Sequence, residues 1–194
     1  MEINWKLDML KEMGVTPINL RPRDWVLLLL HVGGRNPIKG EESFHTTLFM
    51  MQCPPVVFKT LLLSVFSPEI HQAIEHLIEE GLIKREYKYE GSKLIEIYSL
   101  SPLGVEEASR LAEKASGSYM FIGGAAIRKG DDVLSELEAL KKTYNGRGLK
   151  EGLKLILDKL GSKVSDFESP LEAFCDSSEL DYMKKLFKIY REEF

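Results

Sequence analysis

The sequence is poor in cysteine, and its apolar runs are short. Cys53 and Cys175 are the only cysteines and form no C-x-x-C pair, so we expect reduced thiols and neither a disulfide framework nor a zinc site. The longest apolar run, Trp25 to Leu30, is far shorter than the roughly 20 residues of a membrane helix. The first residues, Met1 to Lys6, lack the basic and then apolar pattern of a signal peptide. We therefore expect a soluble, cytoplasmic protein with no membrane partner.

An excess of positive charge is also missing. The 194 residues include 26 Lys and Arg against 30 Asp and Glu, which gives a formal net charge of −4. Such a chain does not attract phosphate groups as a whole, so nucleic-acid binding would require a local basic patch. The hydrophobic fraction of 44% is ordinary and allows a sizeable core without disulfides or metals.

No familiar catalytic motif is present. The glycine-rich stretch from Gly146 to Gly152 lacks the G-K-[ST] of a phosphate-binding loop, and neither a nucleophile elbow nor H-E-x-x-H occurs. His71 and Glu75 have i, i+4 spacing, with His76 next along the chain, but a metal site requires a third ligand on the same face. We expect no enzymatic activity, no metal and no cofactor.

The sequence does contain several helix patterns. A helix is predicted from Pro22 to the pair Gly33-Gly34, and it is apolar all round and therefore buried. The stretch Pro37 to Gly40 fits a turn or a very short strand. A second helix follows and stops before Pro54. Residues 56–66 fit either a strand or a buried helix, because periodicity does not separate the two over so short a run.

The third helix carries the clearest signals. Ser67 is a good N-cap and Pro68 suits the first helical position. Apolar residues then recur with helical spacing as far as Glu80. Gly81 suits the position after the helix, where Leu82 makes the accompanying hydrophobic contact.

A β-hairpin and a further helix follow. The strands are predicted at Ile83–Tyr89 and Leu94–Leu100, separated by a turn that contains glycine. Ser101-Pro102 then opens a helix whose predicted apolar stripe includes Leu103 and Ala108. Helix, helix, helix, hairpin and helix, in this order, indicate a winged helix-turn-helix.

The residue patterns of two stretches resemble those of known protein families. Residues Ile74–Ile83 and Ile97–Ala108 resemble PadR-like and MarR-like transcriptional regulators, in which the pattern reads approximately L-x-x-L-x-x-x-G-L-I followed by Y-x-L-T-x-x-G. Residues Trp25–Met51, with Pro37-Ile38-Lys39-Gly40 in the middle, resemble an archaeal winged-helix family. The resemblance covers about half of the chain.

We predict a mostly α fold with a small β-hairpin: a winged helix-turn-helix plus a C-terminal helical region. The predicted boundaries are an N-terminal helical extension at 1–20, the winged-helix domain at 21–115, a junction at 116–130 and the C-terminal helices at 131–194. Such helices commonly dimerise winged-helix regulators, so we expect a homodimer. The seam residues would be Leu180, Met183, Phe187 and Tyr190, and packing of this seam on its own chain is the alternative.

The resemblance implies a transcriptional regulator that binds double-stranded DNA as a dimer. In such proteins the third helix lies in the major groove and the wing contacts the backbone or minor groove. The candidate DNA contacts of the wing and its surroundings are Lys84, Arg85, Lys88, Lys93, Arg35 and Lys39. The third-helix candidates are His71, Gln72 and His76.

The charge of the third helix favours a second hypothesis. Between Ser67 and Glu80 the sequence has four glutamates and no Lys or Arg, a charge of −4 on the element that would approach phosphates. The predicted wing, with four basic residues against three glutamates, carries only +1. The alternative function is therefore a winged-helix protein–protein interaction module that uses the acidic helix and reads no DNA.

Overall fold

The computed structural model describes residues 12, 14–61, 64–124 and 126–147. In chain order the elements are β1 (Ile18–Asn19), α2 (Pro22–His31), β2 (Ile38–Lys39), α3 (Glu42–Phe49), β3 (Lys59–Leu61), β4 (Ser64–Phe66), α4 (Pro68–Glu79), β5 (Ile83–Glu90), β6 (Lys93–Leu100), α5 (Pro102–Ser116), β7 (Tyr119–Ile122), β8 (Ala126–Lys129) and α6 (Gly130–Tyr144).

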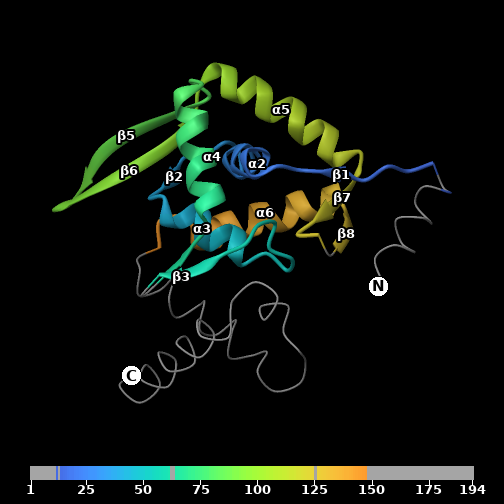
Figure 1. The fold of residues 1–194 in the computed structure, drawn as a ribbon. Coiled ribbons are helices and arrows are strands. Elements are labelled where there is room, and N and C mark those ends of the chain that lie inside the picture. The colour runs from blue at the N-terminus through green and yellow to red at the C-terminus, as the bar shows by residue number, and fades with distance from the viewer. Residues whose placement is uncertain (1–11, 13, 62–63, 125, 148–194) are drawn as a thin grey trace, which may run out of the picture.

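Helix α2 forms the centre of the core. Its six consecutive side chains from Trp25 to Leu30 each expose 1% or less of their surface. Because the helix is apolar on every side, it requires neighbours on every side, and α4, α5, α6 and β6 supply them. Figure 1 shows α2 end-on, between α5 on one side and α6 on the other. The prediction of a buried helix starting at Pro22 is confirmed.

The prediction of a mostly α fold with a small hairpin is wrong. The described residues form an α+β fold, with five helices, two three-stranded sheets and a separate two-stranded hairpin. One sheet has the order β2-β6-β5 and the other β1-β7-β8. The additional strands are only two to four residues long, which is too short to leave a clear alternating pattern in the sequence.

The second sheet joins β1, near the start of the described chain, to β7 and β8, which follow α5. Ile18 pairs with Met120 in a parallel register, and β7 continues into the antiparallel strand β8. Met120 and Ile122 are buried in the same core as α2. Helix α6 then packs against α2, α3 and α5. Residues 116–130, predicted as a junction, therefore contain a sheet that packs on the core.

Local signals around α4 are confirmed. Gly81 has a φ of 71°, and the two hydrogen bonds of a Schellman motif follow α4: Gly81 N to Ile78 O and Leu82 N to Leu77 O, both 2.9 Å. The predicted hairpin is present as β5 and β6. Leu103, in contrast, is 63% exposed, so its place in the apolar stripe of α5 is wrong. The neighbouring Gly104 is buried instead. Only glycine fits at this position, because the Leu82 carbonyl leaves no room for a side chain.

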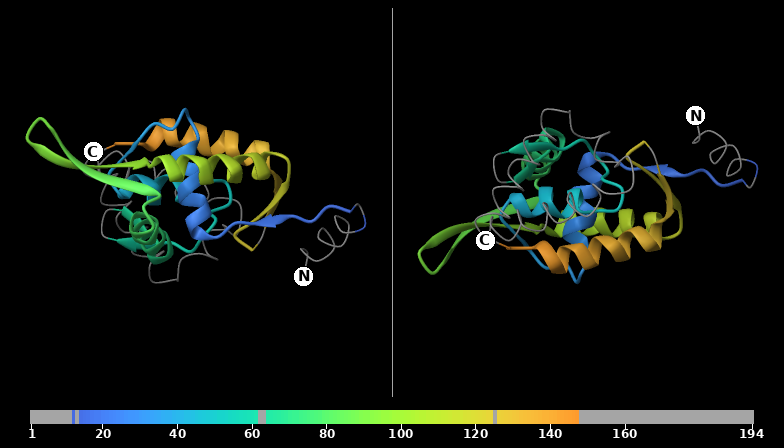
Figure 2. Two further views of the ribbon diagram at one scale, coloured as in Figure 1. Left: turned by 90° about the horizontal axis from the view of Figure 1, so that it is seen from above. Right: turned by 90° about the horizontal axis from the view of Figure 1, so that it is seen from below.

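The β5–β6 ribbon, hereafter the wing, projects away from the helical body in both views of Figure 2. Residues Glu90 and Lys93 pair across its tip, which leaves the two-residue turn Gly91-Ser92. Gly91 has a φ of 62°, which suits a glycine in the first position of such a turn.

None of the described helices combines the length and the apolarity that a membrane crossing requires. The predicted helices beyond Arg147, including the dimer seam, and most of the extension at 1–20 lie outside the described residues.

A substitution at Gly130 tests whether the second sheet and α6 pack on the core. A Cβ at Gly130 would lie 1.7 Å from the Ala115 carbonyl oxygen, which is backbone and has no freedom to move aside. We expect Gly130→Ala to lower the free energy of unfolding by about 3 kcal/mol. Gly117→Ala is the control, because its Cβ would meet nothing closer than 4.0 Å and its φ of −78° suits alanine. Equal stability of the two variants in urea titrations would contradict the packing described.

Lys141 makes stability depend on pH. Its ammonium group is buried and donates to the carbonyl oxygens of Leu30 (3.0 Å) and Val32 (2.9 Å), at the end of α2. Burial lowers the pKa of Lys141 from 10.5 to about 8. Between these values the unfolded chain binds more protons than the folded one, so stability rises with pH.

We expect the stability difference between the wild type and Lys141→Met to shift by about 2 kcal/mol in favour of the wild type between pH 8 and pH 10.5. Lys142→Met, which removes an exposed lysine from the same helix, is the matched control. A difference for Lys141→Met that stays constant over this range would mean that the amine titrates as it does in water.

Candidate functional site

The two faces of the wing differ in chemistry. Residues that pair directly across an antiparallel ribbon lie on the same face, and successive residues alternate. One face, hereafter the tyrosine face, therefore carries Arg85, Tyr87, Tyr89, Leu94, Glu96 and Tyr98. The opposite face, hereafter the lysine face, carries Lys84, Glu86, Lys88, Glu90, Lys93, Ile95, Ile97 and Ser99.

The outer part of the tyrosine face is an exposed apolar patch. Tyr87, Tyr89 and Leu94 are 58%, 77% and 55% exposed, and Tyr89 pairs directly with Leu94. The remaining described large apolar residues with such exposure, Val57 and Leu103, lie elsewhere in the fold. Three such side chains together on one projecting ribbon are a feature typical of interaction surfaces.

The base of the tyrosine face is fixed to the helices. The Tyr98 ring is fully buried and packs edge-on against Phe44 of α3, with ring centroids 5.4 Å apart. Arg85 forms a two-pronged ion pair with Glu75 of α4, with N–O distances of 2.6 and 3.2 Å. The hydrogen bond to Glu75 also raises the pKa of Arg85. The tyrosine face therefore continues directly from the surface of α4.

The lysine face lies on the other side of the ribbon. Lys39 of β2 pairs with Ile97 and so shares this face, where its ammonium group forms an ion pair with Glu90. The Lys88 Nζ atom lies 3.4 Å from Glu86 Oε2 and forms an ion pair with it. Four lysines against two glutamates give this face a charge of about +2, counted from Lys39, Lys84, Lys88, Lys93, Glu86 and Glu90.

Helix α4 presents an acidic surface. Its apolar residues face the core, so its glutamates are distributed over the opposite half of the helix. Arg23 of α2 binds Glu80 with both terminal nitrogens, at 2.8 and 3.1 Å. Glu75 of α4 and Glu80, directly after α4, are therefore already bound to Arg85 and Arg23.

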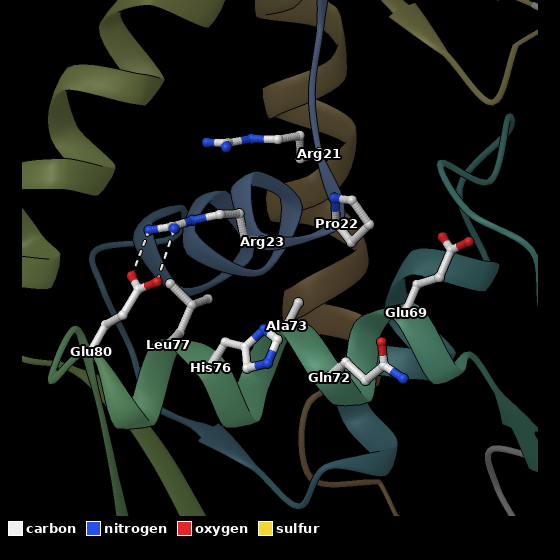
Figure 3. Close-up of a pocket in the computed structure, with 9 residues that line it drawn as sticks. All are labelled: Arg21, Pro22, Arg23, Glu69, Gln72, Ala73, His76, Leu77 and Glu80. Atoms are coloured by element: carbon white, nitrogen blue, oxygen red, sulfur yellow. Dashed lines mark hydrogen bonds and ion pairs between the residues drawn. The ribbon is translucent and has the colours of Figure 1, made fainter.

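A shallow groove of about 290 Å³ runs between the start of α2 and one side of α4. Gln72 and His76 line it together with Arg21 and the Arg23–Glu80 ion pair (Figure 3). Its walls carry both signs of charge, so no single ligand charge fits it. The groove places two of the third-helix candidates on the side of α4 that faces α2.

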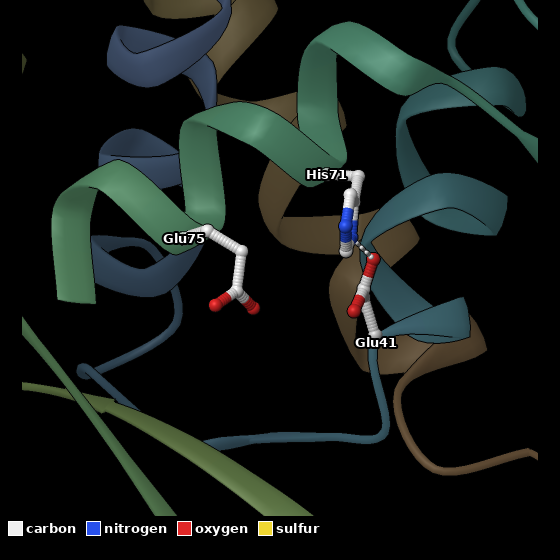
Figure 4. Close-up of side chains that lie close together, drawn as sticks. All are labelled: Glu41, His71 and Glu75. Atoms are coloured by element: carbon white, nitrogen blue, oxygen red, sulfur yellow. Dashed lines mark hydrogen bonds and ion pairs between the residues drawn. The ribbon is translucent and has the colours of Figure 1, made fainter. Parts of the chain in front are cut away.

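His71 lies on the other side of α4, where it contacts Glu41 directly before α3 (Figure 4). The His71 Nδ1 atom lies 2.7 Å from Glu41 Oε1, and the buried His45 Nε2 lies 3.2 Å from the same oxygen. Burial disfavours the charge of Glu41, but the hydrogen bonds from His45 and His71 outweigh it and lower the pKa of this carboxyl. Glu75 completes a group in which ligand atoms of Glu41, His71 and Glu75 lie within 4.8 Å of one another.

The structure separates the predicted DNA contacts. Lys39, Lys84, Lys88 and Lys93 share the lysine face, whereas Arg85 lies on the tyrosine face and is paired. Arg35 lies in the loop between α2 and β2, and its φ of 64° is rare for a residue other than glycine. His71 is on one side of α4, and Gln72 and His76 are on the other.

Two features of the site could not be predicted from the sequence. The alternation of Tyr87 and Tyr89 with charged residues was visible, but only the hairpin register places Leu94 beside them and shows that the patch lies beyond the helical body. The contact of Glu41 with His71 spans 30 residues of sequence. No signal in the sequence pairs residues at that separation.

Comparison of the chain with protein-family models, with curated protein sequences and with solved structures finds no match.

Proposed function

We propose that this protein is a protein–protein interaction module on a winged-helix frame, in which α4 and the tyrosine face of the wing bind a basic segment of a partner protein. The frame is suggested by the order of α2, β2, α3, α4, β5 and β6, with β2 joining the wing as a third strand. The observation that carries the proposal is the acidic α4 beside an exposed apolar patch.

The charge of α4 supports a basic partner over DNA. Phosphate binding relies on free Lys and Arg side chains, and α4 has none. Arg23 and Arg85 would have to leave their carboxylates to reach a phosphate, which would expose two more negative charges to the DNA. A basic protein segment meets the same surface without this cost, because opposite charges guide the two partners together.

The tyrosine face supplies the apolar part of such an interface. Aromatic residues are enriched in the buried centres of protein interfaces, and tyrosine is among the side chains that contribute most to binding. Tyr87, Tyr89 and Leu94 would be covered by an apolar anchor of the partner, with its basic residues directed toward α4. The proposal therefore specifies a segment with both a basic and an apolar side.

A cytoplasmic location and a homodimer remain part of the proposal. In this proposal the predicted seam of Leu180, Met183, Phe187 and Tyr190 forms the dimer.

Charge reversal on α4 tests the partner's chemistry. Glu69 and Glu79 are exposed and lie outside the two arginine pairs of α4, so Glu69→Lys with Glu79→Lys should leave the fold intact. We expect immobilised full-length variant to retain about tenfold less of a specific partner from the source lysate than the wild type, because like charges now oppose each other. The partner is identified by mass spectrometry.

The matched control is charge reversal on α5, with Glu106→Lys and Glu113→Lys, which changes the net charge equally. Tyr87→Ser with Tyr89→Ser should reduce retention to a similar extent as the α4 variant. Equal retention by all variants, or loss in the α5 control as well, would argue against a specific acidic surface.

The lysine face favours a second candidate function, binding of the DNA backbone through the wing alone. If this face binds duplex DNA, its affinity falls as the salt concentration rises. Replacement of Lys84, Lys88 and Lys93 by Gln should then make the slope of log affinity against log salt less steep by about 3. Under the interaction proposal, gel shifts at about 50 mM salt show no DNA complex for the wild type or the variant. A complex that only the wild type forms would make DNA binding the better account.

A further inference from the structure

We propose that Glu41, His71 and Glu75 bind one divalent transition-metal ion, for which Zn²⁺ is the probe. The three residues come from two parts of the fold (Figure 4). Glu41 directly precedes α3, whereas His71 and Glu75 lie one turn apart on α4. The missing third ligand of the His71–Glu75 pair is therefore supplied by a residue 30 positions earlier in the chain.

The spacing of the ligand atoms is close to that of a metal site. One ligand atom of each residue lies within 4.8 Å of the other two. Two atoms bound to one tetrahedral Zn²⁺ at about 2.1 Å each lie about 3.4 Å apart. An ion between the three side chains would therefore draw them together and replace the hydrogen bond between His71 Nδ1 and Glu41. Two carboxylates and one imidazole leave a further coordination position for water, as in an open zinc site.

Both carboxylates are held in place by residues outside the ligand set. His45 is 3% exposed, and its Nδ1 accepts a hydrogen bond from the Ser67 backbone N–H at 3.2 Å. The proton of neutral His45 therefore lies on Nε2, which donates to Glu41 Oε1. Such outer hydrogen bonds orient metal-binding carboxylates and their loss weakens metal binding.

Arg85 holds the Glu75 carboxylate in place. Its two-pronged contact fixes the plane of the carboxylate, and each oxygen keeps a second lone pair. Glu41, Glu75 and Arg85 together carry a charge of −1, so a divalent cation would be attracted to the group. The His71 side chain is 45% exposed, which leaves a path for the ion from solvent.

The ligand types select the metal. An imidazole with carboxylates suits Zn²⁺, Co²⁺ and similar ions, whereas Mg²⁺ and Ca²⁺ prefer oxygen ligands alone. The proposal therefore predicts that Zn²⁺ and Co²⁺ bind and that Mg²⁺ at the same concentration does not.

The test is calorimetric titration of the full-length protein with Zn²⁺, together with the thermal midpoint with and without the ion. We expect saturable binding of one ion per chain and a rise in the midpoint, since a ligand of the folded state stabilises it. Glu41→Gln and His71→Asn should each weaken binding about 100-fold and abolish the rise. Co²⁺ should give a visible absorption band that both variants lose.

The controls separate this group from the chain's other potential ligands. Glu79→Gln and His76→Asn lie on α4 outside the group and should leave Zn²⁺ binding unchanged. Glu75→Gln, at a half-exposed position, is the second test should Glu41→Gln fail to fold. No saturable binding by the wild type, or equal binding by the Glu41 and His71 variants, would show that the group is only a hydrogen-bonded contact between α3 and α4.

Discussion

The complete burial of α2 is the constraint on which the rest of the structure depends. A helix that is apolar on every side has no solvent-facing surface, so the chain must bring a neighbour to each side of it. Helices α4 and α5 supply two sides, and α6, the last described helix, supplies a third. Lys141 of α6 also satisfies the last carbonyl groups of α2, so the core and its polar end both depend on α6.

This packing determines which surfaces remain for function. Helix α4 uses its one apolar side against α2, and its acidic half stays exposed. Its carboxylates bind the nearest arginines, Arg23 and Arg85, and the second of these ties the wing to α4. The outer wing then extends beyond the core with its tyrosines uncovered (Figure 2). The acidic helix and the wing that carries the apolar patch are thus linked through the Arg85–Glu75 pair at the base of the wing.

Local patterns predicted the parts of the fold that local physics determines. The helix starting at Pro22, the cap at Gly81 and the hairpin with its turn at Gly91 follow from side-chain periodicity and from the backbone freedom of glycine. Strand β1 was missed because it pairs with the remote strand β7. Strands β7 and β8 were missed because four residues each are too few for a clear alternating pattern. The group around Glu41 was missed because Glu41 and His71 are 30 residues apart in the sequence. The exposure of Leu103 was missed because helical periodicity alone does not show which side of α5 is covered.

Site-specific photo-crosslinking at Tyr89 in living cells tests the central claim most directly. This residue is 77% exposed on the tyrosine face, and Leu103 on α5, at 63%, offers a control position of similar exposure. With the crosslinker at Tyr89, we predict one discrete adduct that protease destroys and nuclease leaves intact, and that is absent when the crosslinker replaces Leu103. An adduct that nuclease destroys, or the same products at both positions, would contradict a protein-binding wing.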